Sequence, residues 1–343
     1  MTSTHNGGDL ARKPNFARRI KWLGIFTLLA MLAWTGAWFW LADLGQTKVD
    51  EALAKANARG RPVACDNRSI KGYPFRFGLF CDSVRFEDPT RGVRVSASAL
   101  RTAAQVYNPW HLIAELEGPA LIDAPGLQPL EIHWSLLHAS MRANKPLPDR
   151  VSVEGKGLDV GLRIEAGAVA RAIAADYAAG HMRREDKDVA FAGEAGGLSI
   201  DPAITPERTI PLLSASYDVL LKDGVRIIAA KPKDIPAALR GQRGEIRSAV
   251  VIFDEGGEAR VAGPVSLDST GLLDGDITVT FKDGDKLGQA LARAIPEAAS
   301  VIKPALSAAA LAAGKYKEAS LILTIRKGRV SAGFIPIGNI PAL

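Results

Sequence analysis

The sequence predicts a β-rich α+β protein: an N-terminal transmembrane helix, then a large, mostly antiparallel curled sheet with a few Ala-rich helices packed on it. Three observations predict this class. An uncharged run lies near the N-terminus, short alternating apolar segments bounded by turn residues fill most of the rest, and helical periodicity is confined to a few stretches. The roughly 300 residues after the run suffice for one large or two smaller domains.

The uncharged run is Trp22–Ala42, 21 residues long. At about 1.5 Å per residue it can cross a hydrocarbon core roughly 30 Å thick. Five basic residues and one acid, Asp9, precede it; the basic residues are Arg12, Lys13, Arg18, Arg19 and Lys21. Because basic residues beside a first span stay cytoplasmic, we expect a cytoplasmic tail over residues 1–21, a single pass through a bacterial inner membrane, and a periplasmic main domain.

A cleaved signal peptide and a buried core helix are the alternatives to a retained anchor. The run is longer than the apolar region of a signal peptide, and Asp43-Leu44-Gly45-Gln46 offers no small-x-small cleavage site. Aromatic residues crowd its far end, as in the belt that meets a membrane interface; they are Trp34, Trp38, Phe39 and Trp40. These features favour a retained anchor, although cleavage stays open.

The net charge of +6 is unevenly distributed. Residues 1–21 carry five Lys/Arg and one Asp, a net charge of +4, whereas the remainder carries 38 basic and 36 acidic residues, a net charge of +2. The high pI therefore comes mostly from the basic residues before the apolar run, which indicate membrane topology. A nearly balanced main domain gives no basis for a nucleic-acid partner.

The two cysteines, Cys65 and Cys81, follow soon after the membrane run. The charge rule places them in an oxidising compartment, where a disulfide is the favoured interpretation. A metal or redox pair is the alternative, but there is no CxxC and no histidine between them.

A helical stalk is expected over residues 43–62, before a β-rich domain over residues 63–343. Val49, Leu53 and Ala56 fall at helical spacing within Gln46–Arg59, and Gly60 and Pro62 end the pattern. A partner-binding helix is the alternative interpretation of this segment.

Most of the following chain alternates as β-strands do. The expected strands contain Phe75–Leu79, Val84–Phe86, Val93–Ala97, Ala120–Ile122, Leu130–Met141, Val151–Leu162, Val189–Ile200, Ser214–Leu221, Val250–Phe253, Ala259–Leu267, Leu272–Phe281, Leu321–Ile325 and Val330–Ile337. Asp254–Gly257 and Asp268–Gly271 are suitable turns for a meander. Ala-rich Glu165–Gly180 and Lys286–Ala313 are the expected helices, the second one broken near Pro296 or Pro304. Two loosely similar halves, split near residues 180–210, suggest a duplication.

One local stretch is distinctive: Gly72, Tyr73, Pro74, Phe75, Arg76 and Phe77, between the two cysteines. It is interpreted as a core-entering edge strand held by the disulfide, with an aromatic ligand surface as the alternative. Further short motifs accompany it: Asn108-Pro109-Trp110, Trp134 with Ala139-Ser140, and Lys327-Gly328-Arg329 leading to Pro336-Ile337-Gly338.

Together these motifs resemble the domain of unknown function 2125 family, found in alphaproteobacterial envelopes, over most of residues 45–343. That family has no established activity, so the resemblance implies no catalytic residues. More distantly, one N-terminal anchor before a long β-rich chain is similar to the AsmA-like periplasmic proteins, which are associated with lipid movement and envelope maintenance.

The search for chemistry gives no catalytic, metal or cofactor site. The histidines show no metal-ligand spacing, and His133 and His138 have opposite parity in one expected strand. The charged run His181–Asp188 is interpreted as a solvated loop. An unrecognised hydrolase with scattered catalytic groups stays an alternative.

The sequence therefore favours a non-enzymatic envelope module that binds lipid or another apolar ligand on a curled sheet roofed by helices. A structural or protein-interaction component of the envelope, with a sealed core and a partner-binding edge, is the alternative. The ligand, the partner and the oligomeric state are not encoded in any motif.

Overall fold

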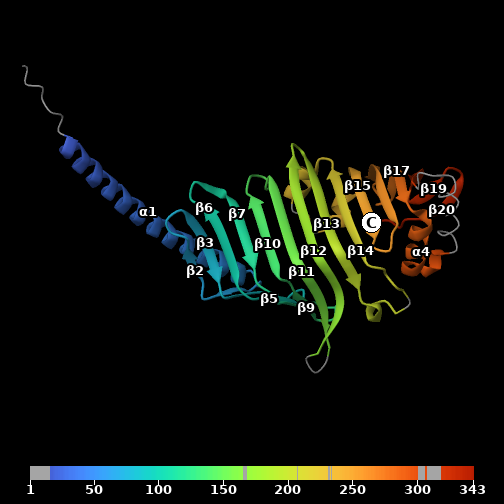
Figure 1. The fold of residues 1–343 in the computed structure, drawn as a ribbon, viewed down its shortest axis with the longest axis horizontal. Coiled ribbons are helices and arrows are strands. Elements are labelled where there is room, and N and C mark those ends of the chain that lie inside the picture. Colours follow the sequence, from blue (N-terminus) through green and yellow to red (C-terminus); the bar gives the residue numbers. More distant parts are fainter. Residues whose placement is uncertain are drawn as a thin grey trace, which may run out of the picture.

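A computed structural model of the protein describes residues 16–164, 168–206, 208–230, 232, 234–299, 306 and 318–343. One 43-residue helix, α1 (Phe16–Ala58), extends from one end of a long twisted sheet (Figure 1). It contains the whole apolar run and most of the predicted stalk without a break. Of the described helices, α1 alone is long and apolar enough to cross a membrane.

One stripe of α1 faces the domain. Its less exposed positions recur every three or four residues, as expected for one helical face; they are Thr35, Trp38, Ala42, Gly45, Val49, Leu53 and Ala56. Of these, Trp38 and Ala42 are buried. The stripe thus begins inside the apolar run and continues to the end of the helix, so the part of α1 after the run also packs on the domain. Gly60, at φ +72°, ends the helical path.

Within the described residues, twenty strands form one open, antiparallel sheet. In chain order they are β1 (Val63–Asp66), β2 (Ser69–Lys71), β3 (Arg76–Cys81), β4 (Ser83–Asp88), β5 (Val93–Ala97), β6 (Leu100–Gln105), β7 (Asn108–Leu116), β8 (Ala120–Asp123), β9 (Leu130–His133), β10 (Leu136–Arg142), β11 (Arg150–Arg163), β12 (Val169–Glu185), β13 (Asp188–Ile200), β14 (Leu213–Leu221), β15 (Arg243–Phe253), β16 (Glu258–Leu267), β17 (Leu273–Lys282), β18 (Glu318–Arg326), β19 (Arg329–Ala332) and β20 (Ile335–Asn339). The predicted fold class, a β-rich protein with an antiparallel sheet behind an N-terminal helix, is confirmed.

The sheet forks at β11. The first half of β11 pairs with β10 and its second half pairs with β9. From β10 the first leaf continues through β7, β6 and β3 to β2. From β9 the second leaf continues through β8, β5 and β4 to β1. In Figure 1, β5 and β9 of the second leaf lie below and behind the first leaf.

The chain crosses repeatedly between the two leaves. One crossing corrects the prediction of a single strand over Leu130–Met141, because Trp134 and Ser135 separate β9 from β10 and the two strands belong to different leaves. The Trp134 indole Nε1 donates to the carbonyl oxygen of Leu116 at 2.8 Å, which fixes this crossing. A buried indole N–H needs such an acceptor.

A disulfide joins Cys65 to Cys81, as the sequence favoured. Cys65 lies on β1 and Cys81 on β3, so the bond connects the two leaves at the end farthest from β11. The forked part of the sheet is thus closed covalently at one end and by shared backbone pairing at the other.

From β11 onward the strands form a meander through β20. The predicted turns connect these strands as expected. In the turn before β17, the Asp268 carboxylate accepts hydrogen bonds from the backbone N–H groups of Thr270 and Leu272 at 2.8 and 3.0 Å.

The Ala-rich helix predicted over Glu165–Gly180 is wrong. Residues 165–167 lie outside the described part, and Val169–Glu185 forms the long strand β12, paired along its length with β11 and β13. Ala and Arg are good helix formers, but intrinsic propensity is small in energy, and pairing with two long neighbouring strands overrides it. The charged run His181–Asp188 is likewise not a loop, since it is the end of β12, the Asp186-Lys187 turn and the start of β13.

Apart from α1, the helices of the described residues are short. They are α2 (Gly224–Ala229), α3 (Ile235–Leu239) and α4 (Gly284–Ala294), with 3-10 turns η2 (Pro202–Ile204) and η3 (Pro296–Ala298). Of the helices predicted over Lys286–Ala313, α4 accounts for the first and ends before Pro296, while residues 300–305 and 307–317 lie outside the described part. Leu287 and Ala290 of α4 pack on Phe253 and Phe281 of the sheet. These four residues form a buried cluster.

Candidate functional site

One face of the sheet is apolar and continuous across both halves of the molecule. Directly opposed residues in antiparallel strands point to the same face, so the pairing register shows which side chains share it. Three neighbouring rows on this apolar face contain no charged residue. The anchor row contains Phe77, Ala104, Leu112, Met141, Val151, Met182, Phe191, Val219 and Ile246.

The middle row contains Ala114, Ala139, Val153, Gly180, Gly193, Tyr217, Ala249, Val261, Val279 and Leu321. The third row, which leads to the cluster under α4, contains Leu137, Gly155, Ala178, Ala195, Ala215, Val251, Ala259, Phe281 and Ala319. At about 4.8 Å between strands, the nine-residue anchor row extends about 38 Å. The apolar face is therefore longer than a single acyl chain, since the hydrocarbon core that two leaflets form together is roughly 30 Å thick.

The apolar face is open at β11 and β12. No atom of the described residues lies within 4 Å of the position that a Cβ on Gly180 would take. Val153, opposite Gly180 in the pairing register, is 43% exposed although its neighbours on this face are apolar. The position above Gly180, beside Val153, is thus an open trough on the apolar face, whereas the ring of Tyr217 covers the next position in the middle row, Gly193.

The second leaf presents an apolar row toward the first. It contains Cys65, Val84, Ala97, Ala120, Ile132 and Val160. Because Cys65 is bonded to Cys81 of the first leaf, the faces that carry these residues are turned toward each other.

The space between the leaves lacks the packing of an ordinary core. Within residues 63–163, all of which the structure describes, the buried residues are Gly78, Cys81, Asp88, Ala120, Gly155 and Gly161. Every Val, Leu, Ile, Phe and Met of that segment keeps some exposure, whereas close-packed cores bury such side chains completely. The leaves therefore enclose apolar surface without sealing it.

The far end of the anchor row enters an apolar pocket of about 300 Å³. Phe191, Val219 and Ile246 of the row line this pocket, together with Leu239 of α3 and the C-terminal residue Leu343. The Leu343 backbone N–H donates to the Gly271 carbonyl at 3.0 Å, and Arg240 donates to the Leu343 carbonyl oxygen at 2.9 Å. The end of the chain is thus held as one wall of the pocket.

The near end of the anchor row meets α1, the candidate membrane span. The Trp38 ring of α1 is stacked on the Phe77 ring, with centroids 5.2 Å apart and planes at 6°. The Trp38 indole Nε1 also donates to the Arg76 carbonyl oxygen at 3.0 Å, and Tyr73 meets Trp38 edge-on at 5.5 Å. The apolar face therefore extends from α1 to the pocket beside Leu343.

The distinctive stretch Gly72–Phe77 lies at this junction between α1 and the sheet. Gly72, at φ +121°, leaves no room for a Cβ beside the Arg76 backbone. Four residues of this stretch contact α1: Tyr73, Pro74, Arg76 and Phe77. The predicted edge strand is wrong in one respect, since β3 pairs on both sides and the three-residue β2 is the edge.

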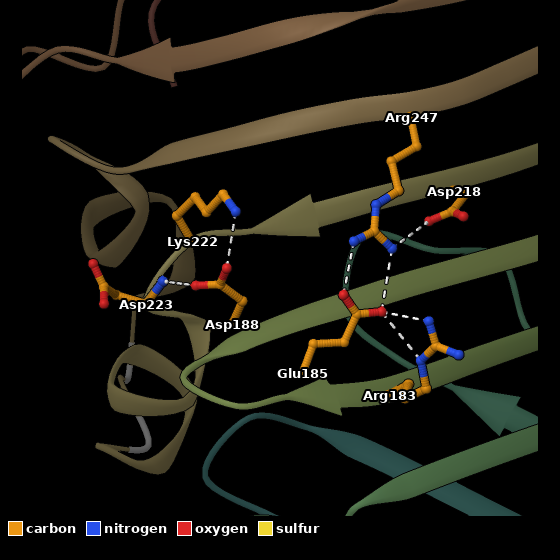
Figure 2. Close-up of polar contacts among 7 residues, drawn as sticks. All are labelled: Arg183, Glu185, Asp188, Asp218, Lys222, Asp223 and Arg247. Atoms are coloured by element: carbon orange, nitrogen blue, oxygen red, sulfur yellow. Dashed lines mark hydrogen bonds and ion pairs between the residues drawn. The ribbon is translucent and has the colours of Figure 1, made fainter.

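The opposite face of the same strands is polar. Around β12 it carries an ion-pair network in which Arg247 donates to Glu185 at 2.7 and 3.2 Å while Arg183 donates to the same carboxylate (Figure 2). Hydrogen bonds from Arg247 and then Arg183 lower the pKa of Glu185 from its ordinary 4.5 to about 2. In the same view Lys222 and the Asp223 backbone N–H hold Asp188, both at 2.9 Å.

Three of the described histidines pair singly, each with a different partner. His133 lies 2.7 Å from Glu131, His138 lies 3.2 Å from Glu154, and His181 lies 3.0 Å from the Ser152 hydroxyl. His133 and His138 belong to separate strands in separate leaves, which corrects the single-strand parity argument. Among the described residues, no three His, Cys, Asp or Glu side chains converge on a common metal position.

Comparison with protein families gives one match. A family model described as "Uncharacterized protein conserved in bacteria (DUF2125)" matches residues 38–341. The chain belongs to this family. The DUF2125 match begins at Trp38, which packs α1 on the sheet, and it includes both leaves and the strands that line the pocket, but it ends before Leu343. Comparison with curated proteins finds no match.

Sequence reasoning missed the central residues of this DUF2125 site. Gly180 was placed at the end of a helix, so its position on the apolar face was not predicted. A signal was present in β12, where Ala178, Gly180 and Met182 alternate with Ala179, His181 and Arg183. Their small size made the alternation weak beside the helix preference of alanine.

Proposed function

We propose that this protein is a single-pass, membrane-anchored periplasmic module that binds acyl lipid, or a ligand equally apolar, along the open face of its sheet. The observation that carries the proposal is the anchor row. It begins on Phe77, stacked on the membrane helix, and ends in an apolar pocket about 38 Å away at ~4.8 Å per strand.

The site has the chemistry of a lipid site. Lipid pockets are mostly apolar and need few polar groups, and each buried methylene contributes about 0.8 kcal/mol. An acyl chain leaving the membrane beside α1 would meet apolar side chains at every step along the row. Open space above Gly180 and the incomplete burial between the leaves favour a ligand-binding face over the structural alternative, which requires a sealed core.

The predicted topology supports a periplasmic location. Basic residues precede the helix and the domain after it holds a disulfide, which forms in an oxidising compartment. The proposed site needs no cofactor and no nucleic-acid partner, because binding by apolar burial requires neither.

Native mass spectrometry of the gently extracted full chain tests the proposal. The wild-type protein should carry additional mass that lipid extraction assigns to phospholipid. Gly180→Phe should place a ring in the trough, since no described atom lies within 4 Å of a Cβ at this position, and should lose most of that lipid. Ala179→Phe is the matched control, because Ala179 opposes Glu154 and Glu194 on the polar face. A clean apo mass in repeated wild-type preparations would contradict lipid binding and support the structural alternative.

A further inference from the structure

A short aromatic loop, Gly72–Arg76, lies against the part of α1 that is apolar enough to be in the membrane. The Trp34 indole Nε1 donates to the Pro74 carbonyl oxygen at 3.1 Å, and the hydroxyl groups of Thr35 and Tyr73 are 2.8 Å apart. Both helix residues belong to the uncharged run Trp22–Ala42. The loop is therefore fixed to the membrane segment itself.

The level of these contacts along α1 sets the depth of the loop. Trp34 precedes Ala42, the last residue of the uncharged run, by eight positions. At 1.5 Å per residue this places the Trp34 level about 12 Å inside the outer end of the run. If the run spans the bilayer, the loop lies at the depth of the outer leaflet and not in bulk water.

The side chains of the loop suit that depth. Phe75 is 62% exposed and Tyr73 is 50% exposed, although both are aromatic. The Val106 backbone N–H donates to the Phe75 carbonyl at 3.0 Å, which brings in the next residue, Tyr107, itself 76% exposed. Aromatic rings are apolar enough for a hydrocarbon environment, and the Tyr73 hydroxyl has a polar partner there in the Thr35 hydroxyl. Lys71 and Arg76 flank the loop with positive charge, which suits anionic lipid phosphates.

We infer that Tyr73, Phe75 and Tyr107 form a membrane-inserted aromatic patch, and that its partner is the phospholipid leaflet into which α1 emerges. The patch holds the near end of the anchor row at the bilayer. This inference rests on the membrane anchoring proposed above and not on ligand binding by the sheet.

Depth measurement by spin labelling tests the patch. The two native cysteines are joined in a disulfide, so an introduced cysteine is the only free thiol. Phe75→Cys and Tyr107→Cys in the full chain, each carrying a nitroxide, are reconstituted in phosphatidylethanolamine–phosphatidylglycerol vesicles. At both positions, collision with oxygen should exceed collision with a water-soluble nickel chelate. Tyr107→Cys provides a second position because its side chain is mostly free of protein contact.

Two control positions separate the possible failures. Leu29→Cys, on the exposed surface of α1, should report the membrane interior, and Phe334→Cys, exposed between β19 and β20, should report water. If Leu29 reports the interior while positions 75 and 107 match Phe334, the patch is not inserted and the inference is wrong. If Leu29 also reports water, the anchoring itself fails and the inference fails with it.

Discussion

Trp38 and Phe77 lie face to face, one on α1 and the other at the start of the anchor row, with ring centroids 5.2 Å apart. Their positions differ by 39 in the sequence, and Trp38 is only 5% exposed. This contact packs α1, the candidate membrane span, against the domain at the end of its apolar face.

Trp38→Ala should destabilise the protein by about 3 kcal/mol, since it removes a buried aromatic side chain and its hydrogen bond to Arg76. Denaturant unfolding in mild detergent measures this change. Trp40→Ala is the control, because Trp40 is 66% exposed and its loss should change stability by less than about 0.5 kcal/mol. Equal effects of the two substitutions would show that the Trp38 contact does not join helix and sheet.

Replacing Cys65 and Cys81 together by Ser should lower the melting temperature. The bond closes a loop with a sequence separation of 16 residues, which is worth about 3 kcal/mol in the chain-entropy model. The leaves should also separate more easily at the end far from β11, which faster amide exchange in β1 and β3 would report. Adding a reductant to the double variant provides the control and should change nothing. An unchanged melting temperature would mean that the bond is absent or without effect on stability.

Glu185 should make stability depend on pH in the acid range. Its folded-state pKa, about 2, lies below the ordinary 4.5, so the stabilisation is present above pH 4.5 and is lost as the pH falls toward 2. Glu185→Gln should therefore lower stability at pH 7 by roughly 1 kcal/mol, after allowance for partial solvent screening. It should also flatten the dependence between pH 4.5 and 2.

Arg247→Gln gives a matched test of the same ion pair. It should cost a similar amount, and the double variant should cost less than the sum of the two single variants because Glu185 and Arg247 share one contact. Additive effects with a wild-type pH slope in Glu185→Gln would contradict this account of the polar face.

A reporter fused after Leu343 should be active only in the periplasm. Alkaline phosphatase, which needs an oxidising compartment, should be active there, and a green fluorescent protein exported by the same route should stay dark. The basic residues before α1 are the cause, so replacing Arg18, Arg19 and Lys21 by Gln should weaken this orientation. Fluorescence of the wild-type fusion in the cytosol would reverse the topology and remove the basis for the disulfide.

The sequence predicted well those features that local chemistry determines. The membrane run, the Cys65–Cys81 pairing, the turns at Asp254 and Asp268 and most strand positions all depend on neighbouring residues. The fork at β11 could not be predicted, because it depends on which distant strands pair with each half of one strand. Gly157, at φ +58° between those halves, gave no more signal than any other glycine.

The sequence predicted that the candidate site would be an apolar sheet surface, but it did not predict which residues form that surface. An apolar face under a curled sheet followed from strand alternation, whereas the rows depend on register across many strands, which one sequence does not reveal. β12 shows the difficulty most clearly, since alanines typical of a helix occupy the strand that carries Gly180. The aromatic stretch Gly72–Phe77 was recognised as distinctive, but its contact with α1 joins segments more than 30 residues apart.

Photo-crosslinking at Gly180 tests the central claim most directly. Benzoylphenylalanine at position 180 faces the open apolar trough, whereas the same residue at position 179 faces the polar side of the same strand. After illumination of cells grown with labelled phospholipid precursors, position 180 should form a lipid adduct on the folded, disulfide-bonded protein and position 179 should not. Equal labelling at both positions, or none at position 180, would contradict a lipid-binding face.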